Sequence, residues 1–261
     1  MDIKMDEKKF NRIFSAAVLI GMVVTIAIIT IFKLGSPDAR VGMLIVASLA
    51  SLMGVLSTVL SANGIIWTFI FGILDVVFCS IVAYDSGATG NLALHVLYFL
   101  PMQFVGLWMW RKRGASGSSK VKARRMNESQ RVILAAAVAA GITVAYLVLL
   151  KVDLMKVEAG KIGSVDRWKV FFDAAVLVLN IAGQILMSMA FFEQWIVWNL
   201  VNIFSILLWG SIMLSSETSG YTVVMMAKYC FYLLNSLNGL RIWHGLSKEG
   251  AEVEESAHDC C

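Results

Sequence analysis

Amide, indole and carboxylate side chains interrupt several long apolar stretches of this 261-residue sequence. In one stretch, four of them are spaced so that they share a stripe of an α-helix: Trp195, Trp198, Asn199 and Asn202. Amide groups offer hydrogen-bond donors and acceptors, whereas indole rings stack on flat rings and attract cations. The stripe therefore predicts a binding site for a polyhydroxylated or amide-bearing ligand, or for a flat cationic ring.

Further polar residues in the apolar stretches are candidates for the same site. Asp75 is the strongest, because a carboxylate deep in a membrane span is functional by default. We expect it to face a cationic ligand, and a protonated, structural Asp75 is the alternative. The other candidates carry amide or phenol groups: Gln184, Gln103, Tyr98, Tyr229, Tyr232 and Asn238. Each amide also has a simpler interpretation, since Asn and Gln can bond a neighbouring membrane helix.

The sequence lacks the residue patterns that are typical of enzymes. It contains three histidines, and no pair of residues has the spacing of metal ligands. It also lacks a glycine-rich phosphate loop and a nucleophile–base signature. We therefore expect no enzymatic activity, no metal and no cofactor. Because no ATP-binding motif is present, any transport must be driven by something other than a built-in ATPase.

The elements that must position these residues follow from the composition. The chain is 59% hydrophobic and 15% charged, against about 45–50% and 25% in soluble domains. A soluble domain of this size cannot bury so much apolar surface. The sequence therefore predicts an all-α integral membrane protein with eight transmembrane helices. Their expected bounds are Phe14–Phe32, Val41–Leu60, Ile65–Ala83, Leu92–Trp110, Val132–Leu150, Val170–Met189, Trp195–Leu214 and Val223–Trp243.

The distribution of basic residues predicts the orientation in the membrane. Segment Arg111–Arg131 holds eight basic residues and one acidic residue, and such loops remain in the cytoplasm. With eight spans, both termini are then cytoplasmic. The first span is expected to be retained rather than cleaved as a signal peptide, because its apolar run is too long. The basic segment lacks aromatic residues, so we expect lipid and not nucleic acid as a partner.

Three other residues near the expected membrane boundaries receive structural interpretations. Trp110 and Trp243 each close an apolar stretch and are expected to anchor at the membrane interface. Lys228 lies near the outer end of the last span, and its long side chain is expected to reach water.

A weak internal repeat predicts how the helices are arranged. Gly106-Leu-Trp-Met-Trp110 ends the fourth span, and Gly239-Leu-Arg-Ile-Trp243 ends the eighth. Spans two to four thus resemble spans six to eight, which indicates two parallel three-helix bundles joined by a linker helix (3+1+3), plus an extra N-terminal helix. The expected divisions are 1–40 (N-terminal cytoplasmic segment and extra helix), 41–113 (first bundle), 114–167 (basic loop, linker helix and outer loop), 168–244 (second bundle) and 245–261 (cytoplasmic tail).

The second half of the chain resembles the PnuC family of bacterial nicotinamide riboside transporters. The resemblance rests on Phe172-Asp173, Gln184, Glu193-x-Trp195-x-x-Trp198-x-x-x-Asn202, Tyr229-x-x-Tyr232 and Asn238-Gly239-x-x-x-Trp243. A fainter version in the first half comprises Phe71-Gly72, Asp75, Tyr98 and Gln103-x-x-Gly106-x-Trp108-x-Trp110. The sequence departs from the family at Met189–Phe192, where members commonly carry basic residues, and at Gln103 and Val105, where Asn and Tyr are frequent.

The resemblance implies a fold shared with the SWEET sugar transporters, assembled as a homotrimer in the bacterial inner membrane. It implies uptake of nicotinamide riboside by facilitated diffusion, with a cytoplasmic kinase that traps the product as its phosphate. Thiamine, also a flat cation, is the alternative substrate. A different class is a retinal-type photoreceptor, with Lys228 as the Schiff base and Asp75 as its counter-ion. A structural scaffold without a ligand is the third hypothesis.

Overall fold

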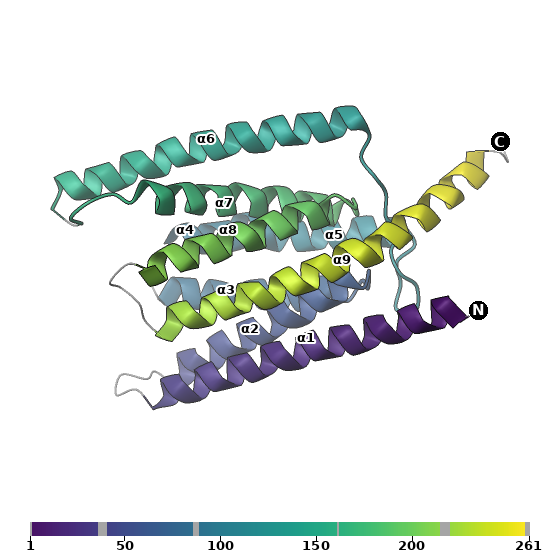
Figure 1. The fold of residues 1–261 in the computed structure, drawn as a ribbon, viewed down its shortest axis with the longest axis horizontal. Helices are drawn as coiled ribbons and strands as arrows, with labels where there is room; N and C mark the ends of the chain where they lie inside the picture. Colours follow the sequence, from purple (N-terminus) through teal and green to yellow (C-terminus); the bar gives the residue numbers. More distant parts are fainter. Residues whose placement is uncertain (1, 36–40, 86–88, 161, 215–219, 259–261) are drawn as a thin grey trace.

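The computed structural model describes residues 2–35, 41–85, 89–160, 162–214 and 220–258, and every regular element in these ranges is helical (Figure 1). The elements in chain order are α1 (Asp2–Leu34), α2 (Val41–Ala62), α3 (Thr68–Asp85), α4 (Thr89–Leu94), the π-helix η1 (His95–Phe99), α5 (Leu100–Lys112), α6 (Glu128–Glu158), α7 (Arg167–Ser188), α8 (Gln194–Leu214) and α9 (Gly220–His258).

Within the described residues, seven helical segments are long and apolar enough to cross a membrane. They correspond to the first seven expected spans, and α2 begins at Val41 and α8 ends at Leu214, as predicted. The eighth expected span lies within the 39-residue helix α9, where several side chains near its start are outside the described part. The prediction of an all-α, multi-pass membrane protein is therefore confirmed.

The helices pack side by side, with α6 on the outer edge against α7 (Figure 1). Helix α3 contacts α2 and α5, and α8 contacts α7 and α9. These two groups meet through α5 against α7 and through α9 against α2, while α1 lies on α2 and α9. The start of α1, the end of α9 and the segment between α5 and α6 lie at one end of the molecule (Figure 1). We call it the basic end, because that segment carries most of the clustered arginines and lysines.

The expected fourth span is not one continuous α-helix. It consists of α4, the π-helix η1 and α5, and the Leu100 backbone N–H donates to the His95 carbonyl five residues earlier. Pro101 lies in the first turn of α5. A proline has no N–H and its ring displaces the carbonyl four residues before it, so the preceding turn widens. The proline thus explains the break that hydropathy did not reveal.

Residues 114–127, which we call the strap, connect the helices of the basic end. The Val121 N–H donates to the Gly64 carbonyl in the α2–α3 turn at 3.0 Å. The Arg124 N–H donates to the Ala190 carbonyl in the α7–α8 turn at 3.0 Å, and the Arg124 carbonyl accepts from the Phe192 N–H at 2.8 Å. Val121 and Ala123 are buried. The strap is therefore hydrogen-bonded to one turn in each half of the molecule.

Candidate functional site

The predicted stripe on α8 forms part of a hydrogen-bonded group with α9. The Asn202 amide donates to the Ser236 hydroxyl at 3.1 Å, and that hydroxyl lies 2.9 Å from Asn199 Oδ1, to which it donates. The Asn199 amide in turn donates to the Trp195 carbonyl within its own helix. Since Asn202 is buried, the two asparagines of the stripe face α9 and not lipid.

Trp198 and Gln184 meet at the contact between α7 and α8. The Trp198 ring covers Gly183, where an added Cβ would lie only 3.1 Å from the indole. Gln184, next along α7, is buried, and its amide lies 3.4 Å from the Ser188 hydroxyl, to which it donates. Ser188 donates to the Met102 carbonyl of α5 at 3.2 Å. Gln184 is therefore linked through one serine to the first half of the molecule.

Two candidates from the first half reach α7 and α3. The Tyr98 hydroxyl, on the π-helix, donates to the Ile181 carbonyl of α7 at 2.6 Å. Gln103 of α5 is buried against Gly72 of α3, where an added Cβ would lie 2.5 Å from Gln103 Oε1. A side chain at position 72 would therefore displace this amide from its present position. Tyr98, Gln103 and Gln184 thus all lie along the contacts of α5 and η1 with their neighbours.

Asp75 belongs to a separate group, which faces α2 and α9. Its carboxylate lies against Gly54, where a Cβ would be 3.1 Å from Oδ1, and it accepts from the Cys79 thiol at 3.4 Å. Lys228 of α9 is close enough to interact electrostatically with Asp75, and its ammonium lies 5.3 Å from the Tyr232 ring centroid. Lys228 is therefore part of this group, and its side chain is partly exposed.

The phenols of α9 complete the Asp75 group. The rings of Tyr229 and Tyr232 pack edge to face with centroids 6.1 Å apart. Tyr232 also packs against a cluster formed by α1 and α2, which contains Val18 and Val59. The extra N-terminal helix α1 therefore supports the wall of the molecule on which Tyr232 lies.

The tryptophans of the basic end form a buried core. Trp195 is 3% exposed, lies against Gly239 and has its ring 6.1 Å from that of Trp243. Trp110 and Trp243 are both fully buried, with ring centroids 5.4 Å apart. Their indoles donate to the Met187 carbonyl of α7 and the Ser61 carbonyl of α2, respectively, in different helix groups. The prediction that Trp110 and Trp243 anchor at the membrane interface is therefore wrong.

Several predicted site residues carry buried polar atoms without a hydrogen-bond partner. Within the described part of the chain, these include the Gln103 carbonyl oxygen, the Trp195 indole N–H and one amide of Asn238. An unpaired buried polar group costs about 1–3 kcal/mol, and each such group in a folded protein needs an explanation. One explanation is that a bound polar ligand supplies the hydrogen-bond partners that these atoms lack.

The small hydroxyl side chains that connect these amides were not among the predicted site residues. Ser236 joins Asn199 to Asn202, and Ser188 joins Gln184 to α5. Asn235, also not a predicted site residue, bonds a neighbouring helix, because its amide donates to the Thr58 carbonyl of α2 at 3.1 Å. A usable signal was present for Ser236, because it lies four residues after Tyr232 in a stretch rich in asparagine.

Glu193, the acidic residue of the resemblance motif, has a structural role. It is buried and accepts from the Met126 N–H at 3.1 Å and from the Arg131 guanidinium at 3.1 Å. Met126 lies near the end of the strap, and Arg131 lies in the first turn of α6. Glu193 therefore connects the start of α8 to the point where the strap enters α6.

Comparison with known proteins places this chain among transporters. A family model described as nicotinamide mononucleotide transporter matches residues 44–245. Curated relatives named nicotinamide riboside transporter PnuC include one from Neisseria mucosa, 32% identical over 77% of this chain and 73% of its own length. Another, from Haemophilus influenzae, is 28% identical and covers 77% and 80%.

A solved structure agrees with these sequence matches. The crystal structure of the Vitamin B3 transporter PnuC is 28% identical and superposes with a TM-score of 0.65, covering 91% of this chain and 93% of the other. Two of the four residues of the Glu-x-Trp-x-x-Trp-x-x-x-Asn motif, Glu193 and Trp195, are buried at the basic end. The family model spans most of the residues, and both sequence and fold agree, so this chain belongs to the PnuC family of membrane transporters.

Proposed function

We propose that this protein carries nicotinamide riboside across the bacterial inner membrane. Family membership supports this function together with one structural observation: the predicted site residues carry buried donors and acceptors that lack partners. Nicotinamide riboside offers a flat cationic ring, a carboxamide and ribose hydroxyls. These groups match the indoles and amides of the site in chemistry, since amides can serve both as donors and as acceptors.

In this proposal, each ligand group has a partner of suitable chemistry. Trp198 stacks on the pyridinium ring, and Trp195 donates its indole N–H. Asp75 supplies a negative charge for the cationic ring, and Lys228 interacts with the same carboxylate. The amides and phenols that bind the carboxamide and the ribose are Gln103, Gln184, Asn199, Asn202, Asn238, Tyr98, Tyr229 and Tyr232.

The transport mechanism we propose is facilitated diffusion between two parallel three-helix bundles, α2–α5 and α7–α9, linked by α6. Rocking of such bundles exposes a central site to each side in turn. The basic end faces the cytoplasm, in line with the positive-inside rule, and both termini lie there. A cytoplasmic kinase traps the product, and the assembly is a homotrimer. Size-exclusion chromatography with light scattering tests the trimer.

Uptake of labelled nicotinamide riboside into proteoliposomes tests the site. The informative variant is Asn202→Leu, which removes the amide that bonds Ser236. Asn180→Leu is the matched control, since the Asn180 amide donates only to the Val176 carbonyl of its own helix. We expect Asn202→Leu to abolish saturable uptake with a nearly unchanged unfolding temperature. Equal uptake by both variants contradicts the assignment of Asn202.

Competition between unlabelled compounds tests the substrate. We expect excess nicotinamide riboside to suppress labelled uptake, with thiamine and nicotinamide mononucleotide much weaker. Stronger suppression by thiamine would move the assignment to that vitamin. In vesicles without a kinase, nicotinamide riboside should reach the same concentration inside and outside, whatever the pH gradient. It should accumulate only in vesicles that enclose a kinase with ATP. Accumulation driven by a pH gradient alone contradicts facilitated diffusion.

A retinal-binding photoreceptor is the second candidate, because Lys228 and Asp75 are electrostatic neighbours. A Schiff base on Lys228 would need such a counter-ion. Family membership favours transport instead. If no visible absorbance band develops after incubation of the purified protein with retinal, this candidate is excluded.

A further inference from the structure

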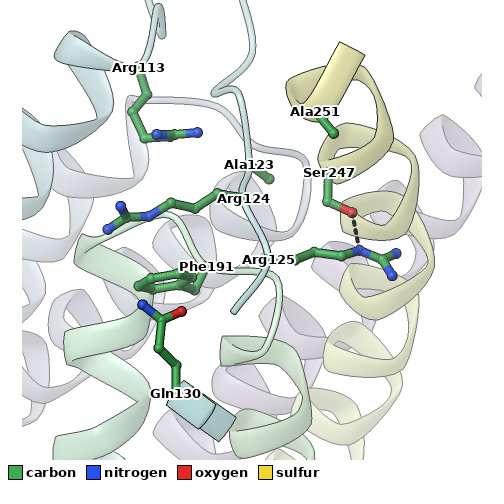
Figure 2. A pocket seen from close by; sticks show the side chains of 8 residues that line it. All are labelled: Arg113, Ala123, Arg124, Arg125, Gln130, Phe191, Ser247 and Ala251. Atoms are coloured by element: carbon green, nitrogen blue, oxygen red, sulfur yellow. Dashed lines mark hydrogen bonds between the residues drawn. The ribbon is translucent and has the colours of Figure 1, made fainter. Parts of the chain in front are cut away.

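Three arginines line a cavity at the basic end, and each is held by contacts within the protein (Figure 2). Their Nε atoms donate to the Lys122 carbonyl (Arg113), the Met189 carbonyl (Arg124) and the Ser247 hydroxyl (Arg125). These cations therefore fasten the strap to the ends of α5 and α7 and to α9. Lys228 of α9 is a different kind of cation, because it lies among residues that we assign to the cargo.

The surroundings of Lys228 have the chemistry of a cation-binding site. Its ammonium lies 5.3 Å from the Tyr232 ring centroid, within the roughly 6 Å over which an aromatic face attracts a cation. Tyr229 packs edge to face on Tyr232, and the Asp75 carboxylate is an electrostatic neighbour of the ammonium. An aromatic face and a carboxylate also suit a flat cationic ring.

The carboxylate of this group is held in place, whereas the ammonium is carried by a flexible side chain. Asp75 lies in a notch at Gly54, where an added Cβ would be 3.1 Å from Oδ1, and it accepts from the Cys79 thiol. Lys228 is partly exposed and lies near the start of α9, at the outer end of the helix. Its long side chain can therefore turn toward water without a movement of α9.

We propose that Lys228 is an internal substitute for the cationic ring of the cargo and thereby determines the charge specificity of the carrier. In the empty carrier its ammonium lies against Tyr232 and neutralises Asp75, and the cargo displaces it. This inference rests on the function proposed above. It adds a residue that the cargo must replace, in contrast to the amides and phenols that bind the cargo directly.

Charge balance within the membrane explains why the ammonium must leave. Asp75 and Lys228 together carry no net charge, which favours the empty site, since an unpaired ion is costly at this depth. A cationic cargo beside both would leave one positive charge uncompensated, and two close cations repel strongly at low dielectric constant. When Lys228 turns toward water, the cargo takes its place beside Asp75 and the net charge is again zero. A neutral molecule of the same shape gains nothing from this exchange.

The charge preference of the site tests the exchange. Nicotinamide riboside and its reduced dihydro form have nearly the same shape, but the first is a cation and the second is neutral. Calorimetry on the full-length protein in lipid nanodiscs gives the ratio of the two affinities. We expect Lys228→Met to raise the ratio of cation affinity to neutral affinity about tenfold. Lys228→Arg, which keeps the charge, should leave the ratio close to that of the unaltered protein.

The matched control is Lys169→Met, because Lys169 is an exposed lysine at the start of α7. This variant removes the same charge at the same end of the molecule, outside the Asp75 group. We expect it to leave the affinity ratio unchanged.

Acetylation of the unaltered protein follows the ammonium directly and does not depend on a variant that folds. Mass spectrometry measures the reaction of each lysine with acetic anhydride. In the empty carrier we expect Lys228 to react more slowly than Lys169. Saturating nicotinamide riboside should speed the reaction of Lys228, and the dihydro form should leave it unchanged.

The outcomes separate this inference from the proposed function. If neither compound binds the unaltered protein, the proposed function fails and the role of Lys228 fails with it. If nicotinamide riboside binds but Lys228→Met leaves the affinity ratio unchanged or lowers it, only the role of Lys228 is overturned. The same conclusion follows if Lys228 reacts as fast as Lys169 in the empty carrier, or if nicotinamide riboside does not alter its reaction.

Discussion

The two halves of the molecule, residues 41–113 and 168–244, share a packing scheme at the basic end. Gly106 lies under the Phe69 ring, and Gly239 lies under the Trp195 ring. Four residues after each glycine, a fully buried tryptophan donates its indole N–H to the first helix of the opposite half. The two crossed hydrogen bonds therefore lie at matching places in the two halves, as the predicted internal repeat would lead one to expect, and they join the halves reciprocally.

The polar groups of the two halves differ, although the packing is repeated. At corresponding places, α3 carries Asp75 and α8 carries Asn202. Asp75 lies with a thiol and a lysine, whereas Asn202 lies with Ser236 and Asn199. Asp75 of the first half thus lies in a charged group that Lys228 of α9 completes from the second half, whereas Asn202 lies among neutral hydrogen-bonding groups of its own half. The comparison teaches that the repeat preserves the aromatic framework, while the residues facing the proposed ligand are free to diverge.

Removing either crossed tryptophan should have the largest effect. We expect Trp110→Ala and Trp243→Ala each to lower the free energy of unfolding by about 3–5 kcal/mol, because each leaves a cavity in a buried core. Trp108→Ala is the control on the same helix, since its side chain is 55% exposed. Steric-trapping measurements in bicelles report the energies. A small loss for only one of the two would contradict the reciprocal scheme.

Adding a methyl group at the paired glycines should have the next largest effect. A Cβ at Gly239 would lie 2.5 Å from the Trp195 ring, and one at Gly106 would clash with Phe69. We expect Gly106→Ala and Gly239→Ala each to cost about 1–3 kcal/mol through overpacking. Gly210→Ala is the control, because nothing lies within 4 Å of its Cβ position and alanine favours a helix. The same unfolding measurement compares all three, and a stabilising Gly239→Ala would be the opposite result.

Substitutions in the charged group of Asp75 and Lys228 should alter ligand affinity more than stability. We expect Asp75→Asn to weaken nicotinamide riboside binding about tenfold, or roughly 1.4 kcal/mol, because a cation loses its counter-charge. Lys228→Met should strengthen binding by removing the competing cation. Isothermal titration measures both variants. If the two variants weaken binding equally, Asp75 and Lys228 serve as a structural pair and the charge asymmetry has no role in recognition.

The smallest effect is expected from variants that remove the crossed hydrogen bonds but keep an aromatic ring. We expect Trp110→Phe and Trp243→Phe each to cost about 1 kcal/mol from the lost hydrogen bond, plus a smaller amount for the smaller ring. The double variant should depart from the sum, because the two rings are in contact, with centroids 5.4 Å apart. Thermal unfolding in detergent compares the three proteins. Identical unfolding temperatures for these variants and the unaltered protein would show that the indole hydrogen bonds add nothing.

Hydropathy predicted the helices well and their contacts poorly, for a physical reason. A run of apolar residues must become a helix to satisfy its backbone in lipid, so α2 and α8 have ends that match the expected ones. The same run does not reveal which side chains meet. An indole near a helix end can lie at the membrane interface or in a core. Trp110 and Trp243 are fully buried, so both lie in the core.

The candidate site was predicted with similar limits. Spacing alone identified the shared stripe of Asn199 and Asn202, because residues three apart lie on one helix face. It did not identify Ser236, which connects them from another helix. It paired Lys228 with Asp75 only in the photoreceptor alternative, and spacing gave no reason for the pair, since the two residues are separated by most of the chain. Contacts between distant segments therefore account for the part of the site that the sequence did not reveal.

The strap and the crossed indoles set an energetic cost for opening the basic end in the proposed pathway. Separating the halves there requires breaking the two indole hydrogen bonds and releasing the strap from one of its two turns, at Gly64 or at Ala190 and Phe192. Each hydrogen bond contributes about 1 kcal/mol. If the proposed cargo leaves at the basic end, its binding must therefore supply the energy of these bonds before release on that side.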